Sequence, residues 1–153
     1  MLSTRLVRLI ESHAEELTRD LIQQLKTHPR TPAFSGLPET EVQERTSRVY
    51  RNLGAWLEGS REDMRRHYEE VGADECSKGV PLPEVIYSLV LSKKNLFRYV
   101  RAHGWEGTTL DIFGEQELVN RIDQFYDDAM YYAAVGYERV LRPEAGARVA
   151  KRA

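Results

Sequence analysis

Residues Cys76–Val100, CSKGVPLPEVIYSLVLSKKNLFRYV, contain the helix break that decides the fold. Gly79 follows a polar helical segment, and glycine is the residue that most readily adopts a positive φ at a helix end. Pro81 and Pro83 come next, and Pro83 suits the first position of a new helix, where its missing N–H costs nothing. These residues predict a tight corner with a positive φ at Gly79. The corner is either purely architectural or positioned to hold a ligand or pass a signal to a partner.

The rest of the sequence divides into amphipathic helical segments and has no convincing strand. Apolar residues recur at spacings of three and four, which places them on one face of a helix. The prolines and glycine of HPRTPAFSGLP, residues 28–38, separate the first segment from the second. We therefore predict an all-α fold, a single helical bundle of five or six helices, for which a globin-like arrangement is one option. The predicted helices span about residues 3–26, 38–59, 60–79, 82–104 and 110–141.

Length and charge narrow the domain organisation and the partners. A chain of 153 residues with 41% apolar residues is sufficient for one core, so we expect one domain over residues 1–141 and a polar linker or disordered tail over residues 142–153. A net charge of -2 lacks the basic excess of nucleic-acid-binding proteins. The single cysteine, Cys76, suits a reducing compartment, and the apolar run Val85–Leu91 is too short to cross a bilayer. We expect a cytoplasmic protein without nucleic-acid partners or membrane insertion.

Catalytic and metal-binding motifs are not found in the sequence. HExxH, Walker, GxSxG and CxxC patterns are missing, so we expect no enzymatic activity. Asp123, Asp127 and Asp128 lie one turn apart in the last predicted helix, but di-iron bundles also need Glu-x-x-His pairs. We interpret these aspartates as a solvated helix face, and we expect neither a metal site nor a cofactor.

Candidate ligand-binding residues are histidines and tyrosines on apolar helix faces. His13 lies in an apolar stripe between Ile10 and Leu17, which favours a hydrogen-bonded core histidine over a ligand contact. His67 precedes the corner, and a histidine in an apolar pocket can ligate haem iron. Tyrosines of the last helix could line a pocket, although core packing or subunit contact explains them equally well. The ligand-binding candidates are His67, Tyr68, His13, Tyr126 and Met130.

The last predicted helix carries two adjacent apolar lines. The first consists of Leu118, Ile122, Phe125, Ala129 and Tyr132, and the second of Val119, Tyr126, Met130 and Tyr137. One line can enter the core of a single chain, whereas the other needs a further neighbour. We therefore predict a homodimer through this helix. The alternative is that the helix is central and the other helices of the same chain enclose both lines.

A family resemblance rests on three stretches of the chain. They are LVRLIESHAEELTRDLIQQL (residues 6–25), GVPLPEVIYSLVLSKKNLFRYV (residues 79–100) and FYDDAMYYAAVGYERV (residues 125–140). Together they resemble the N-terminal sensory domain of RsbT co-antagonist proteins of the RsbRD type, which is also found ahead of bacterial histidine kinases. The resemblance implies a non-catalytic signal-input domain of stress or two-component signalling that acts on a downstream signalling protein or output domain. No kinase or STAS output sequence follows, so the chain is either a standalone regulator or an excised domain.

A weaker likeness is to globin-type sensor domains. In those proteins a histidine shortly before a glycine-proline corner is followed by two long helices, and His67, Val80 and Pro81 occur here in a similar order. The distance from His67 to Pro81 is longer than in haem-binding globin sensors. This likeness implies the alternative function, a haem or small-ligand binding sensor or carrier.

Overall fold

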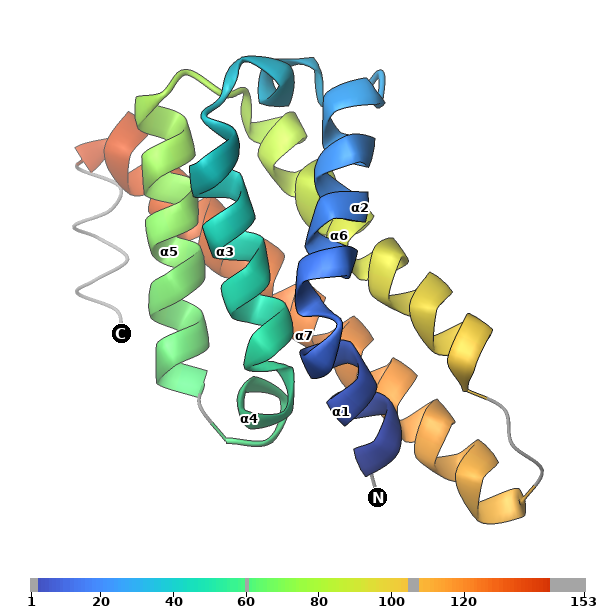
Figure 1. Ribbon diagram of the computed structural model, residues 1–153. Helices are drawn as coiled ribbons and strands as arrows, with labels where there is room; N and C mark the ends of the chain where they lie inside the picture. The colour runs from blue at the N-terminus through green and yellow to red at the C-terminus, as the bar shows by residue number, and fades with distance from the viewer. Residues whose placement is uncertain (1–2, 60, 105–107, 144–153) are drawn as a thin grey trace.

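The computed structural model describes residues 3–59, 61–104 and 108–143. This part of the chain is all-α and contains no strand. The helices are α1 (Thr4–Ser12), α2 (Ala14–Thr27), the 3-10 helix η1 (Pro32–Gly36), α3 (Glu39–Arg51), α4 (Leu53–Glu58), α5 (Arg61–Ser77), α6 (Leu82–His103) and α7 (Thr109–Leu141). The prediction of an all-α bundle is confirmed (Figure 1).

Two of the predicted helices are each divided into two, which raises the number of α-helices above the predicted five or six. The first break lies at His13, between α1 and α2, and the second at Asn52, between α3 and α4. The Ser12 hydroxyl donates to the Arg8 carbonyl at 2.8 Å, and the Asn52 side-chain amide donates to the Arg48 carbonyl at 2.7 Å. These polar side chains bond to the carbonyls of the preceding turn at both breaks, a local alternative to regular helix.

The corner between α5 and α6 has the predicted conformation. Gly79 has a φ of 78°, and its N–H donates to the Cys76 carbonyl at 3.0 Å. The N–H of Val80 reaches back to the Glu75 carbonyl at 3.0 Å, which completes a Schellman motif with Val80 buried behind it. Pro81 caps α6, so Pro83 is the second residue of that helix and not the first, as the sequence had suggested.

The longest helix, α7, runs diagonally behind α3 and α5 (Figure 1). It crosses α5 at very short range, because Gly72 of α5 lies against the backbone of Ala133, and Gly136 of α7 lies against the backbone of Glu69. The Tyr137 hydroxyl also donates to the Val80 carbonyl at 2.6 Å. The terminal helix is therefore joined both to α5 and to the corner that follows it.

The two apolar lines of α7 lie mostly inside this one chain. Ile122 and Phe125 of the first line are buried, and so are Tyr126 and Tyr137 of the second, while Met130 is half-buried against the same core. Other helices of the same chain thus cover most of both lines, although Leu110, Phe113 and Tyr131 of α7 remain exposed. Tyr126 of the second line is buried and not available to a partner subunit, and the homodimer stays a prediction.

Candidate functional site

A small cavity of about 50 Å³ lies among α2, η1, α3, α5 and α6. Most of its wall is apolar, with Leu21 and Leu25 of α2, Phe34 of η1, Val49 of α3 and Leu89 of α6. Such side chains fill the interior of any helical bundle. The polar residues in the wall, described next, distinguish this cavity from ordinary core packing; they are Arg45, Thr46, His67, Tyr68, Glu75, Ser88 and Ser92.

Glu75 carries a buried carboxyl group at the wall of the cavity, and the residue is only 3% exposed. Its Oε1 accepts a hydrogen bond from Arg45 Nη1 at 3.1 Å. Its Oε2 is buried and has no hydrogen-bond partner among the described residues. Burial raises the pKa of Glu75 to about 7, with Arg45 opposing this effect and Asp74 adding to it. The charged form of Glu75 is therefore costly here, and it would be favoured by a donor that reached Oε2.

Arg45 of α3 connects the buried carboxyl group to a cluster of surface charges. Besides Glu75, its guanidinium pairs with Asp74 of α5 and lies 3.7 Å from Glu41. Lys78 pairs with the same two carboxylates, at 2.8 Å in the case of Asp74. These contacts join α3 to the last two turns of α5. Arg45 is thereby held at the boundary between the cavity and solvent.

His67 of α5 lies beside the cavity and is buried, with 6% of the residue exposed. Its ring centroid is 5.2 Å from that of Trp56 and 4.9 Å from that of Tyr68. Burial lowers the pKa of His67 to about 4, and the positive charges of Arg48 and Arg45 act in the same direction. The ring is therefore neutral at neutral pH, and it separates the cavity from the outer surface.

An outer groove of about 380 Å³ runs over the surface of α3 and α5. Arg45, His67 and Val71 line both the groove and the cavity, so these three side chains form the wall between them. The other residues of the groove are charged: Glu41, Glu44, Arg48, Glu70 and Asp74. A ligand could reach the cavity from this side by displacing a few side chains.

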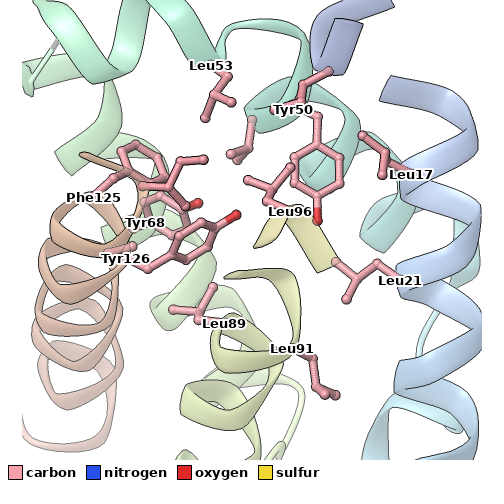
Figure 2. Close-up of a cluster of buried hydrophobic side chains, with 14 of the residues drawn as sticks. Leu17, Leu21, Tyr50, Leu53, Tyr68, Leu89, Leu91, Leu96, Phe125 and Tyr126 are labelled. Carbon is pink, nitrogen blue, oxygen red and sulfur yellow. The ribbon is translucent and has the colours of Figure 1, made fainter. Parts of the chain in front are cut away.

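A buried hydroxyl network adjoins the cavity at Ser92. Ser92 Oγ lies 2.6 Å from the Tyr126 hydroxyl and 3.1 Å from the Tyr50 hydroxyl. Asn95 donates to Tyr50 at 3.3 Å and to the Leu17 carbonyl at 2.9 Å. Figure 2 shows the Tyr50, Tyr68 and Tyr126 rings within the same buried cluster. The network links α7, α6, α3 and α2, and Ser92 brings it to the cavity wall.

The ligand-binding candidates from the sequence occupy different places. His67 and Tyr68 line the cavity, and Tyr126 is connected to it through Ser92. Met130 is half-buried and is not part of the cavity wall.

His13 is exposed, contrary to the expectation of a core histidine. α1 ends just before His13, and the change of helix phase between α1 and α2 buries Ala14 in place of His13. The His13 Nδ1 atom lies 2.8 Å from the Leu9 carbonyl, so the ring packs on its own helix end.

Sequence reasoning missed Glu75, Arg45 and Ser92. A signal for Glu75 was available, because Glu75 follows Val71 by four positions and Tyr68 by seven and so shares their buried helix face. A carboxyl group on an apolar face is rare unless it is paired or functional. Arg45 carried no comparable signal, since its partner lies on another helix.

The spaces beside His67 in this structure are a small cavity and a charged outer groove. Sites that enclose a drug-sized ligand or cofactor measure roughly 300–1,000 Å³ and are mostly apolar. The cavity next to His67 measures about 50 Å³, and the larger outer groove is lined by charged groups. A group of three or more potential metal ligands is not found within residues 3–59, 61–104 and 108–143. Asp123 and Asp128 instead approach Lys93 and Arg61, at 3.1 and 3.5 Å.

Comparisons with known proteins find no matching family model, no matching curated protein and no matching solved structure. Of the helices in the described ranges, none has both the length and the apolar character needed to span a membrane.

Proposed function

We propose that this chain is a non-catalytic signal-input domain that binds a small molecule in the cavity beside Glu75. The observation that carries the proposal is the buried Glu75 carboxyl group at the wall of the cavity, whose Oε2 has no partner among the described residues. Leaving a buried polar atom unpaired costs about 1–3 kcal/mol, so an occupant that supplies a hydrogen bond would be favoured. The sequence resemblance to sensory domains of RsbT co-antagonist proteins supports the same class and a cytoplasmic setting.

The route for the signal is the contact between α5 and α7. Glu75 lies one turn beyond Gly72, which packs on the α7 backbone at Ala133. A ligand that shifts α5 at Glu75 would therefore move α7 as well, since backbone lies against backbone there with no flexible side chain between. We propose that the end of α7, where Val140 and Leu141 are exposed, acts on a downstream signalling protein or output domain.

A thermal-shift screen of small metabolites tests this proposal. The wild-type chain should be stabilised by at least one compound, and a variant with a reduced cavity, Leu89→Phe, should lose that response. Hydrogen exchange of α7 amides should change when the compound is bound. If no compound stabilises the wild type more than it stabilises Leu89→Phe, the proposal is contradicted.

A further inference from the structure

The charge around the cavity indicates which ligands can reach it. Four carboxylates, Glu41, Glu44, Glu70 and Asp74, face two guanidinium groups along the outer groove. Lys78 adds a positive charge beside these carboxylates. The ionised form of Glu75, which lies behind the groove, offsets the charge of Lys78. The region is therefore negative, which raises the local concentration of cations and lowers that of anions.

The size of the cavity limits the ligand further. An apolar cavity of roughly 150 Å³ accommodates benzene, which has six heavy atoms. The cavity beside Glu75 measures about 50 Å³, which by the same measure accommodates about two heavy atoms. Larger amines, amino acids and nucleotides are too large for the cavity in this conformation.

The groups in the wall match a hydrogen-bonding cation better than a metal ion. Calcium takes six to eight oxygen ligands, and magnesium demands a near-ideal octahedron. Glu75 is the only carboxylate in the described wall of the cavity, which also contains the hydroxyls of Ser88 and Ser92 and the Arg45 guanidinium that is paired with Glu75 Oε1. Phe34 and Tyr68 line the same space, and aromatic side chains attract cations. One carboxylate, hydroxyl acceptors and aromatic rings suit an ammonium group, which has N–H donors to share among them.

We propose that the cavity binds a small ammonium ion, either ammonium itself or methylammonium, with its charge against the Glu75 carboxylate. This assignment rests on the proposed ligand-binding function and names its ligand class. Glu75 Oε2 is buried but unpaired, and the terminal torsion of glutamate has a broad minimum, so the carboxyl group can turn toward the ion. Arg45 remains paired to Asp74 when this happens. The N–H donors of the ion then satisfy the unpaired oxygen.

Titration with methylammonium chloride, followed by the backbone amide NMR spectrum at constant ionic strength with potassium chloride, tests the proposal. We expect saturable shifts at the amides around Glu75 and Ser92. Glu75→Gln keeps the shape of the side chain and removes its charge, and it should weaken binding at least tenfold. Glu70→Gln is the matched control, because Glu70 is an exposed groove carboxylate on the same helix. It should retain binding within about twofold if the buried carboxylate is the partner.

Further probes keep the test independent of how Glu75→Gln folds. Val71→Ile adds a methylene to the wall between groove and cavity, and it should weaken methylammonium binding. Methanol, which is of similar size but neutral, and tetramethylammonium, which is larger and has no N–H donor, should not bind saturably. The ammonium assignment would be overturned if methylammonium did not bind saturably. It would also be overturned if Glu70→Gln and Glu75→Gln lost the same affinity for methylammonium, or if methanol bound as tightly as methylammonium. The ligand-binding function would survive these results if another compound stabilises the wild type and not Leu89→Phe.

Discussion

Gly72 of α5 and Gly136 of α7 occupy one helix crossing, where neither position has room for a side chain. A Cβ on Gly72 would lie 1.9 Å from the Ala133 carbonyl oxygen, and a Cβ on Gly136 would lie 1.9 Å from the Glu69 carbonyl oxygen. Both obstacles are backbone atoms, which cannot rotate away as a side chain can. The two glycines thus set the distance between α5 and α7, and through it the position of Glu75 relative to the terminal helix.

Gly72→Ala and Gly136→Ala should each destabilise the protein by about 3 kcal/mol or more, because relief of either overlap must separate two helices. Denaturant unfolding measures the effect. Gly36→Ala is the control, since a Cβ there would meet nothing within 4 Å. Wild-type stability of Gly72→Ala would show that the helices are not packed at this distance.

Gly79→Val should cost on the order of 1 kcal/mol or more through the backbone alone. Gly79 has a φ of 78°, and a Cβ at this position would contact nothing within 4 Å. Gly79→Asn should cost less than Gly79→Val, because asparagine tolerates this conformation better. Thermal melting of the two variants checks this order. Equal melting temperatures for Gly79→Val and the wild type would show that Gly79 does not adopt the positive φ at this corner.

Glu75 and His67 should affect the pH dependence of stability in opposite directions. The pKa of Glu75 rises from 4.5 to about 7 on folding, so the folded state binds more protons and loses stability as pH increases across that range. The pKa of His67 falls from 6.5 to about 4, so the folded state binds fewer protons and gains stability as pH increases across that range. Each slope is about 1.4 kcal/mol per pH unit, and the two offset each other where the ranges overlap.

Unfolding measured from pH 4 to 8 separates the two groups. Relative to Glu75→Gln, the wild type should lose stability as pH increases from 4.5 to about 7. Relative to His67→Asn, the wild type should gain stability as pH increases from about 4 to 6.5. Arg45, Arg48 and Asp74 face these groups and are unchanged in both variants. Parallel curves for all three proteins would mean that neither group is buried in the way described.

The purified protein should be colourless and contain no stoichiometric metal, because the cavity beside His67 is about 50 Å³ and a group of three or more potential metal ligands is not found among the described residues. Visible absorption and elemental analysis of freshly purified protein provide the measurement. A Soret band that disappears in His67→Ala would reverse this expectation and favour the globin-type alternative.

Self-association through α7 stays a prediction. In the structure the apolar residues of α7 that are free to contact a second subunit differ from those expected from the sequence. Leu110 and Phe113 in the first turns of α7 are 72% and 62% exposed, whereas Tyr126 is fully buried. Phe113→Ser should therefore dissociate a dimer without lowering the melting temperature, as followed by light scattering over a range of concentrations. Tyr126→Ser should lower the melting temperature instead. A monomeric wild type at high micromolar concentration would rule out the dimer.

Local features of this fold could be predicted from the sequence, and features that depend on two helices could not. The corner follows from Gly79 and Pro81 alone, because both act on the backbone at their own positions. The break at His13 escaped prediction, since the apolar spacing continues past it and the Ser12 hydroxyl bond leaves no periodic signal.

The candidate site was predictable only in part for the same reason. His67 and Tyr68 stand out by residue type and helix face. The pairing of Glu75 with Arg45 depends on how α3 lies against α5, and no pattern within either helix specifies that. The closeness of Gly72 to α7 likewise requires the positions of both helices.

The crossing of α5 and α7 also affects how the chain folds during synthesis. Gly72 and Gly136 lie far apart in the sequence, so the partner of α5 is made only after α6 is complete. Until then the ribosome-bound chain exposes the face of α5 that α7 will cover, and contacts between such distant segments form slowly. Nascent chains arrested before α7 emerges should therefore be sensitive to protease and to chaperone binding, and folding should become possible only as the last helix leaves the ribosome.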